Sequence, residues 1–230
     1  MANRPPIQAV LFDLDGTLVD TAPDLVAALN MALLDANMAP VAYEQVKDAA
    51  SHGSLALVHA ANVSTDPHIH SQLQQSLLTH YHQINGRHSR YFAGIEALVS
   101  ALHLRGIKQG IVTNKHARFS RPLCRQLPCF TVMETIISGD SCTRAKPDIA
   151  PMLLAASQLA CPPEAILYLG DAKRDMQAAR SAGMVAALAM WGYLGADDIQ
   201  FWPSDIHVHQ PLDLISAIDS ATVNAAVYLP

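Results

Sequence analysis

The sequence lacks the features that mark several classes of protein. Its 15 lysines and arginines are outnumbered by 20 aspartates and glutamates, so it has no basic surplus of the kind that nucleic-acid binding requires. No apolar run approaches the length of a membrane span. The apolar stretch that begins at Ile7 is interrupted by Asp13 and Asp15, which is unlike a signal peptide. We therefore expect no nucleic-acid partner, no membrane partner and no secretion signal.

Cysteine is also scarce. The four cysteines, at positions 124, 129, 142 and 161, form no Cys-x-x-Cys pair, so a zinc site and a disulfide framework are both poor interpretations. The expected compartment is the reducing cytoplasm. Half of the residues are apolar and 15% are charged, which excludes a disordered chain. The length of 230 residues suits one large domain or a core that carries a smaller inserted domain.

The most informative stretch lies near the beginning. An apolar run, Ala9–Phe12, is followed directly by Asp13, Asp15 and Gly16, which predicts a buried strand that delivers two acids to its carboxyl end. Two residues apart in an extended chain, both carboxylates face the same side. They repel unless a cation lies between them or one keeps its proton. The alternative is an ordinary Asp-Gly turn after a strand.

The next part of the chain reads as helical. Residues 22–37 carry apolar side chains at spacings of three and four, and similar stretches cover residues 43–50 and 71–84, which indicates amphipathic helices. Ser51, His52 and Gly53 break the pattern before it resumes at Leu55. Because this block of about seventy residues far exceeds a usual strand-to-helix connection, we interpret it as a helical insertion directly behind the acidic strand.

Beyond Gly94 helices alternate with strands. The predicted strands cover residues 109–113, 134–138, 165–169, 185–190 and, more weakly, 205–208. This order predicts an α/β fold, a doubly wound parallel sheet covered by helices on both faces, with an inserted all-α cap domain. We place the α/β core at residues 1–18 and 91–220, the cap at 19–90 and a C-terminal tail at 221–230.

Three of the predicted strands end in polar residues, at Asp13 and Asp15, at Thr113 and Asn114, and at Asp171. These ends lie side by side in a parallel sheet. Asp171 and Asp175 are four residues apart where a helix begins and therefore share a face, and a divalent cation, best Mg²⁺, would neutralise the carboxylates. The alternative is that Asp171 and Asp175 only cap that helix.

The sequence also offers candidate residues for binding phosphate. Lys146 precedes a proline, which disfavours helix and predicts a rigid loop that holds one cation. Thr113 and Asn114 offer a hydroxyl, an amide and turn N–H groups, all suited to phosphate oxygens. A lone Lys-Pro pair usually marks a solvated loop, but its place between these two strands makes it a candidate for the site.

Four segments together resemble the four motifs of the haloacid dehalogenase superfamily of phosphohydrolases. They are Asp13-Leu14-Asp15-Gly16-Thr17, Thr113-Asn114-Lys115, Lys146-Pro147 and Gly170-Asp171-Ala172-Lys173-Arg174-Asp175. The match runs from about Val10 to Gly192 and includes a helical cap between motifs one and two. Two departures, Ala93 and Ile149 where prolines are usual, touch no catalytic group.

The resemblance implies a role for each matching residue. Asp13 is the expected nucleophile and forms an aspartyl-phosphate, and Asp15 is the expected general acid and base. Mg²⁺ is expected on Asp13, the Asp15 backbone carbonyl and Asp171, supported by Asp175. The expected phosphate ligands are Thr113, Asn114 and Lys146.

Within the superfamily the chain is similar to phosphoglycolate phosphatases and to N-acetylmuramate 6-phosphate phosphatases. Residues 11–25 resemble both groups, whereas Arg118-Phe119 and Trp191-Gly192-Tyr193 look closer to the second. We expect a small phosphorylated metabolite as substrate, with phosphoglycolate first and N-acetylmuramate 6-phosphate or another sugar phosphate as the alternative, and a monomer or homodimer. Ser51, His52 and Gly53 are the candidates for specificity in the cap, although an exposed or structurally satisfied histidine is an equally good reading of His52.

Three other functions are weighed against a phosphatase. A dehalogenase would need neither Mg²⁺ nor an aspartate at Asp15. A phosphomutase would keep all four motifs and differ in the cap. A non-catalytic small-molecule binder on this fold should have lost at least one motif, and none is lost here.

Overall fold

Six parallel strands form the central sheet of the computed structural model, which describes residues 5–195 and 198–226. The strands are β1 (Ala9–Phe12), β4 (Lys108–Val112), β5 (Thr135–Ile137), β6 (Ile166–Gly170), β7 (Val185–Ala189) and β8 (Ile206–Val208). Their spatial order is β5-β4-β1-β6-β7-β8. The first strand thus lies in the middle, hydrogen-bonded to β4 and to β6.

Strand β1 shows why helices cover both faces. Its four residues are all buried, and because successive side chains point to opposite faces, Val10 and Phe12 enter one apolar cluster while Ala9 and Leu11 enter another. Helices α5 (Ile95–Leu104) and α9 (Asp213–Ala226) complete the first cluster, and α7 (Ala150–Gln158) and α8 (Lys173–Ser181) the second. The doubly wound α/β fold expected from the sequence is confirmed.

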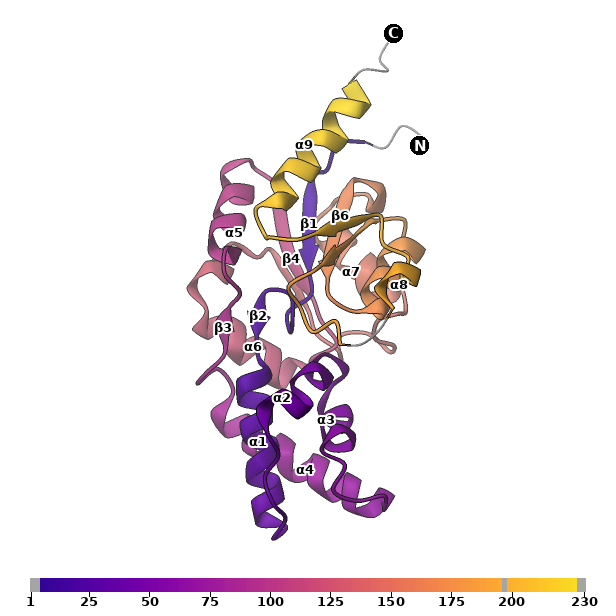
Figure 1. The fold of residues 1–230 in the computed structure, drawn as a ribbon. Helices are drawn as coiled ribbons and strands as arrows, with labels where there is room; N and C mark the ends of the chain where they lie inside the picture. The colour runs from indigo at the N-terminus through magenta and orange to yellow at the C-terminus, as the bar shows by residue number, and fades with distance from the viewer. Residues whose placement is uncertain (1–4, 196–197, 227–230) are drawn as a thin grey trace.

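Four helices form the cap, a name used here for the segment from α1 to α4. They are α1 (Ala22–Asp35), α2 (Tyr43–Val46), α3 (Ser54–Ala61) and α4 (Pro67–Ile84). A short antiparallel ribbon of β2 (Val19–Asp20) and β3 (Arg90–Tyr91) joins the cap to the core. Figure 1 shows the cap stacked at the carboxyl end of β1, at the opposite end of the molecule from α9. The predicted domain boundaries at residues 19 and 90 stay a proposal.

Some element boundaries differ from those expected. The helix expected over residues 43–50 is α-helical only in α2 and continues as a 3₁₀ turn, Lys47–His52, which ends at Gly53 with φ of 89°. Helix α4 begins four residues early, since the Asp66 side chain caps it by accepting the N–H of His68 at 2.8 Å. Helix α9 runs to Ala226 and takes up most of the segment predicted to be a tail, whose residues 227–230 lie outside the described residues.

The remaining helix of the core, α6 (Ala117–Gln126), lies between core and cap. Its Leu123 packs into the core, whereas Phe119 joins the apolar cluster of the cap. Within the described part of the chain, no helix has both the length and the apolar character needed to cross a bilayer.

Candidate active site

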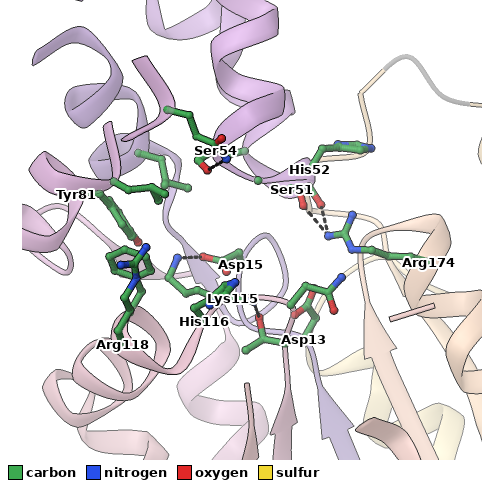
Figure 2. A pocket seen from close by; sticks show the side chains of 18 residues that line it. Asp13, Asp15, Ser51, His52, Ser54, Tyr81, Lys115, His116, Arg118 and Arg174 are labelled. Carbon is green, nitrogen blue, oxygen red and sulfur yellow. Dashed lines mark hydrogen bonds and ion pairs between the residues drawn. The ribbon is translucent and has the colours of Figure 1, made fainter. Parts of the chain in front are cut away.

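The ends of the three central strands meet below the cap. Asp13 directly follows β1, Thr113 follows β4 and Asp171 follows β6, and all three are buried. Parallel strands present their carboxyl ends at one edge of a sheet, so the topology gathers these side chains. A cavity of about 370 Å³ lies between this edge and the cap and is lined by Asp13, Asp15 and Thr113 from the core (Figure 2).

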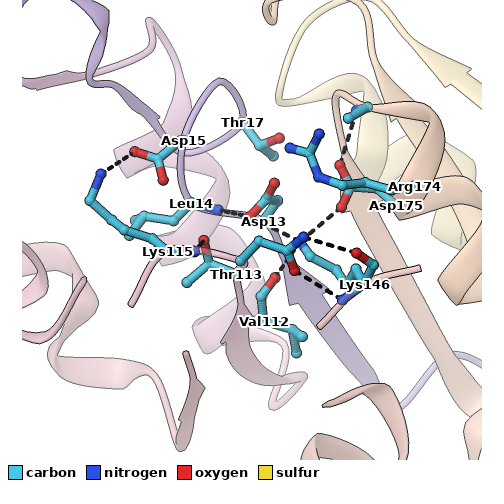
Figure 3. Close-up of polar contacts among 12 residues, drawn as sticks. Asp13, Leu14, Asp15, Thr17, Val112, Thr113, Lys115, Lys146, Arg174 and Asp175 are labelled. Carbon is cyan, nitrogen blue, oxygen red and sulfur yellow. Dashed lines mark hydrogen bonds and ion pairs between the residues drawn. The ribbon is translucent and has the colours of Figure 1, made fainter. Parts of the chain in front are cut away.

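The Lys146 ammonium lies at the centre of the buried polar groups (Figure 3). It is 3.0 Å from Asp13 Oδ1 and 2.8 Å from Asp175 Oδ1. It also donates to the Val112 carbonyl at 2.7 Å and to the Tyr168 hydroxyl at 2.6 Å. Its side chain is fully buried, and a buried charge is tolerated only when paired in this way.

The acid cluster, defined as Asp13, Asp171 and Asp175, is strained electrostatically. Burial raises the pKa of Asp13, although Lys146 opposes the shift. Burial and the charges of the other two carboxylates raise the pKa of Asp171 to about 7. Burial acts in the same direction on Asp175, but Lys146 and Arg174 outweigh it and lower the pKa of that carboxyl. The three acids therefore occupy different electrostatic environments within one cluster.

The acid cluster fits a divalent cation. One oxygen of each carboxylate lies within 4.8 Å of the others, and in the described parts of the chain this is the one group of three acids, histidines or cysteines placed closely enough to hold a metal. Carboxylate oxygens are the ligands that Mg²⁺ prefers. A cation among them would also remove the repulsion that raises the pKa of Asp171.

The loop after β1 is shaped by glycine. Gly16 has φ of 81°, and a Cβ there would lie 2.1 Å from Asp171 Oδ2, so only glycine allows this approach. Thr17 donates its hydroxyl to Asp171 Oδ1 at 3.1 Å, and the Tyr193 N–H donates to Oδ2 at 2.9 Å. The sequence predicted that Asp171 and Asp175 share a helical face. This prediction is wrong, because α8 begins at Lys173 and Asp171 therefore precedes the helix.

The predicted phosphate ligands lie around the same point. Thr113 accepts the N–H of Lys115 through its hydroxyl at 3.1 Å and, with Asn114, lines the cavity. The Asn114 side chain accepts the N–H of Lys146 at 3.0 Å and donates to its carbonyl at 2.9 Å. Asn114 therefore fixes the loop that carries Lys146 to the site.

Asp15 lies on the cap side of Asp13 and has a partner that the sequence reasoning did not identify. Its Oδ1 is 2.7 Å from the Lys115 ammonium and also accepts the Thr21 hydroxyl (Figure 3). The Lys115 side chain is only 7% exposed. Burial acts to lower the pKa of Lys115, but the Asp15 carboxylate and Tyr81 outweigh it and raise that pKa.

The cap residues expected to set specificity, Ser51, His52 and Gly53, all line the cavity (Figure 2). Arg174, at the start of α8, donates to the Ser51 carbonyl at 2.6 Å and to its hydroxyl at 3.3 Å. The structure therefore brings this break in the cap helices against the core. In the part of the chain that the structure describes, the Arg174 Nε atom is buried without a hydrogen-bond partner, so it is an unused donor on this side of the cavity.

The opposite wall of the cavity is more apolar and comes from the cap and from α6. Leu25, Leu78, Tyr81 and Phe119 line it. A second groove of about 410 Å³ adjoins this wall and shares Leu78, Arg118 and Phe119 with the cavity. The cavity and this groove thus meet at the same side chains of α4 and α6.

Residues missed by sequence reasoning share one signal. Lys115 follows β4, Arg174 lies in the first turn of α8 after β6, and Tyr193 follows β7. Each therefore lies shortly beyond the carboxyl end of a strand, where α/β sheets place their sites. Tyr193 also binds the start of the cap, since its hydroxyl accepts the N–H groups of Thr21 and Ala22, each at 2.9 Å.

Known proteins resemble this chain in sequence. A family model described as haloacid dehalogenase-like hydrolase matches residues 10–189. An N-acetylmuramic acid 6-phosphate phosphatase of Pseudomonas aeruginosa is 37% identical over 221 residues, which cover 95% of this chain and 98% of the relative. A phosphoglycolate phosphatase of Xanthomonas campestris pv. campestris is 36% identical over 208 residues, which cover 90% and 94%.

Solved structures show the same fold. A haloacid dehalogenase-like family protein of Streptococcus pneumoniae is similar with a TM-score of 0.79 at 22% identity, over 92% of this chain and 98% of that one. CbbY of Rhodobacter sphaeroides, solved with phosphate, is similar with a TM-score of 0.74 at 21% identity, over 93% and 99%.

Proposed function

The chain belongs to the haloacid dehalogenase-like hydrolase family, and we propose that it is a Mg²⁺-dependent phosphomonoesterase that hydrolyses a small phosphorylated metabolite through an aspartyl-phosphate on Asp13. The observation that carries the proposal is the position of the Asp13 carboxylate. It is buried at the carboxyl end of β1, and its Oδ1 atom lies 3.0 Å from the Lys146 ammonium. It faces a cavity that Thr113 and Asn114 also line. The full set of expected catalytic groups thus surrounds one point.

Asp13 is the nucleophile in this mechanism. Its Oδ1 accepts the N–H of Leu14 at 2.7 Å and contacts Lys146, so the carboxylate is oriented and Oδ2 is left to attack phosphorus. The bond from phosphorus to the ester oxygen breaks as the new bond forms, and the leaving alkoxide takes a proton. Lys146, the Thr113 hydroxyl and the Asn114 backbone N–H stabilise the phosphoryl oxygens.

Asp15 is the proton donor and acceptor. Its place on the cap side of Asp13, at the floor of the cavity, suits contact with the ester oxygen of a substrate bound there. Asp15 protonates the leaving oxygen in the first step and takes a proton from water in the second, when water attacks the aspartyl-phosphate. The two carboxylates thus divide nucleophilic and acid–base work between them.

Mg²⁺ is the cofactor that the acid cluster fits. Asp13, Asp171 and the Asp15 backbone carbonyl would hold it. Asp175 supports them, since its two oxygens already accept Lys146 and the Ala172 N–H at 2.8 and 3.0 Å. When bound, Mg²⁺ neutralises charge on the carboxylates and on the transferring phosphoryl group.

The cap suggests a small substrate. Its helices cover the carboxyl edge of the sheet, and a covered site excludes water and large polymers. The relatives are named for phosphoglycolate and for N-acetylmuramic acid 6-phosphate, and both names describe a phosphate ester that also carries a carboxylate. Phosphoglycolate is the substrate expected from the sequence.

A specific observation favours the larger ester. The cavity of about 370 Å³ has an apolar wall and adjoins the groove beside Arg118 and Phe119, and pockets of this size hold ligands well beyond two carbons. We therefore keep N-acetylmuramate 6-phosphate, or another sugar phosphate, as the second candidate substrate beside phosphoglycolate. For its location we propose the cytoplasm, in keeping with four free thiols.

The proposal is tested by steady-state assays of the purified protein. Phosphate release from p-nitrophenyl phosphate, 2-phosphoglycolate, N-acetylmuramate 6-phosphate and other sugar phosphates should require Mg²⁺, stop in excess EDTA and be inhibited by Ca²⁺, which demands more ligands. Full activity of verified metal-free protein would overturn the metal site and revive a dehalogenase. Phosphoryl exchange between sugar phosphates would identify a phosphomutase, and no turnover of any ester a non-catalytic binder.

A further inference from the structure

Lys115 is a buried cation for which the proposed mechanism has no use. Its ammonium lies in the cavity, 2.7 Å from Asp15 and 4.7 Å from the centre of the Tyr81 ring. Figure 2 shows the Lys115 ammonium between Asp15 and Tyr81. A lysine needed only to stabilise the fold would normally extend its charge into water.

The Tyr81 hydroxyl beside Lys115 has an unused hydrogen-bonding capacity. The Tyr81 side chain is 1% exposed, and apart from the neighbouring Lys115 ammonium its hydroxyl has no hydrogen-bond partner within the described structure. Burial raises the pKa of Tyr81 to about 12, so this hydroxyl keeps its proton and can donate it in a hydrogen bond. The Lys115 ammonium and the Tyr81 hydroxyl thus lie together in one part of the cavity, and the hydroxyl still has its proton to donate.

Substrate binding would take away the present ion-pair partner of Lys115. On the proposed function, the Asp15 side chain turns to the ester oxygen, and Lys115 then loses the carboxylate that neutralises it. A buried ammonium without an anion is costly. The leaving group is the part of the substrate that lies beside Asp15, so it is the part that can supply the new anion.

We propose that Lys115, with the Tyr81 hydroxyl, binds a carboxylate on the leaving group and so selects phosphate esters of carboxylic acids over neutral esters. This inference rests on the proposed phosphatase function and deepens it. It assigns recognition of the acid to a core residue, next to Asn114 on the same loop, and to one cap residue. The occupied site replaces the Asp15 carboxylate with that of the substrate as the partner of Lys115.

Matched substrates test the proposal. The first pair, 2-phosphoglycolate against 2-hydroxyethyl phosphate, differs by the carboxylate. The second pair, N-acetylmuramate 6-phosphate against N-acetylglucosamine 6-phosphate, differs by the lactyl ether that carries the carboxylate. The measured quantity is the preference, the ratio of kcat/KM for the acid to kcat/KM for the neutral ester. We expect a wild-type preference of at least about 100-fold for one pair, as for a charge-assisted contact in a buried site.

Two substitutions should change the preference. Lys115→Met keeps the length of the side chain without its charge and should lower the preference by at least about 30-fold. Lys115→Arg keeps the charge and should retain most of it, whereas Tyr81→Phe should lower it a few-fold. Lys47→Met is the matched control, because Lys47 also pairs with a carboxylate, Glu44 at 2.6 Å, but lies outside the cavity; it should leave the preference unchanged.

The outcomes separate this inference from the function on which it rests. Mg²⁺-dependent hydrolysis of p-nitrophenyl phosphate by the wild type tests the function alone, and its absence overturns both proposals. If the wild type is active but shows no preference in either pair, only the role of Lys115 is overturned. The same holds if Lys115→Met lowers kcat/KM equally for acid and neutral esters, since that result marks a residue that only positions Asp15.

Discussion

The core side and the cap side of the cavity differ in how far their polar groups are paired. On the core side Asp13 lines the cavity, and behind it the buried Lys146 pairs with both Asp13 and Asp175, so these charges are fixed by buried partners. On the side toward the cap His52 is exposed, and within the described residues the Tyr81 hydroxyl has no hydrogen-bond partner apart from the neighbouring Lys115. The Ser51 carbonyl accepts from Arg174 of the core, whose Nε has no partner there. We infer that the core wall performs one reaction, and that the donors beside the cap, on Tyr81 and Arg174, are available to a substrate.

The largest effect should come from the core wall. Asp13→Asn keeps the shape of the side chain but removes the nucleophile, so kcat/KM should fall by at least roughly 10⁴-fold, more than about 5 kcal/mol. Circular dichroism and thermal unfolding should show an intact fold. Near-normal turnover in this variant would remove Asp13 from its role.

Lys146→Met should break the core wall structurally as well. It leaves Asp13 and Asp175 as buried carboxylates without their cation, and removal of one member of a buried pair typically lowers the free energy of unfolding by about 3–5 kcal/mol. Denaturant titration measures the loss. Adding Asp175→Asn should recover part of it, and a double variant no more stable than the single one would contradict this account of the pairing.

Asp171 gives the core wall a dependence on pH in the metal-free state. Because its pKa is raised to about 7 whereas an unfolded aspartate ionises near pH 4, the folded state holds the extra proton between these values. Its stability therefore falls as the pH rises from about 4 to 7 and stays level above. Asp171→Asn should remove this term and, in EDTA at pH 8, stabilise the fold by on the order of 1–3 kcal/mol.

The control for Asp171 is the metal itself. Added Mg²⁺ should raise the melting temperature of the wild type through binding to the folded state, and should not raise that of Asp171→Asn. A variant that is less stable than the metal-free wild type at pH 8 would show that Asp171 is not strained by its neighbours.

The smallest effect should come from the cap wall. Ser51→Ala removes only the 3.3 Å contact with Arg174 and leaves the shorter bond to the backbone carbonyl, so we expect at most about a tenfold change in kcat/KM, about 1.4 kcal/mol. His52→Ala should act likewise. Both variants should change the ranking of small phosphates rather than turnover of p-nitrophenyl phosphate, and an unchanged ranking would place specificity elsewhere in the cap.

The same contrast explains what the sequence could predict. Apolar periodicity and strand ends determine the parallel sheet, so the meeting of Asp13, Thr113 and Asp171 follows from local patterns and topology. Contacts between the two walls do not, because they join residues without any pattern between them: Arg174 and Ser51 are 123 positions apart. For the same reason the sequence did not predict the pairing of Lys115 with Asp15, 100 positions away.

Boundaries were least predictable where backbone hydrogen bonds decide them. The helix expected to reach Ala50 changes to a 3₁₀ turn after Val46, and no apolar spacing distinguishes the two over so few residues. This turn carries Ser51 to the cavity, so the cap residues that face the site depend on a local feature that periodicity does not report.

The most direct test of the central claim is to trap the phosphoryl group on Asp13. Asp15→Asn leaves the first step feasible with p-nitrophenyl phosphate, whose leaving group needs little protonation, but removes the base for the second step. Acid quenching after mixing with ³²P-labelled substrate should give a burst of p-nitrophenol and labelled protein that hydroxylamine releases, with the label on the peptide that contains Asp13. A burst without labelled protein, or a label that persists in the Asp13→Asn/Asp15→Asn double variant, would contradict the account.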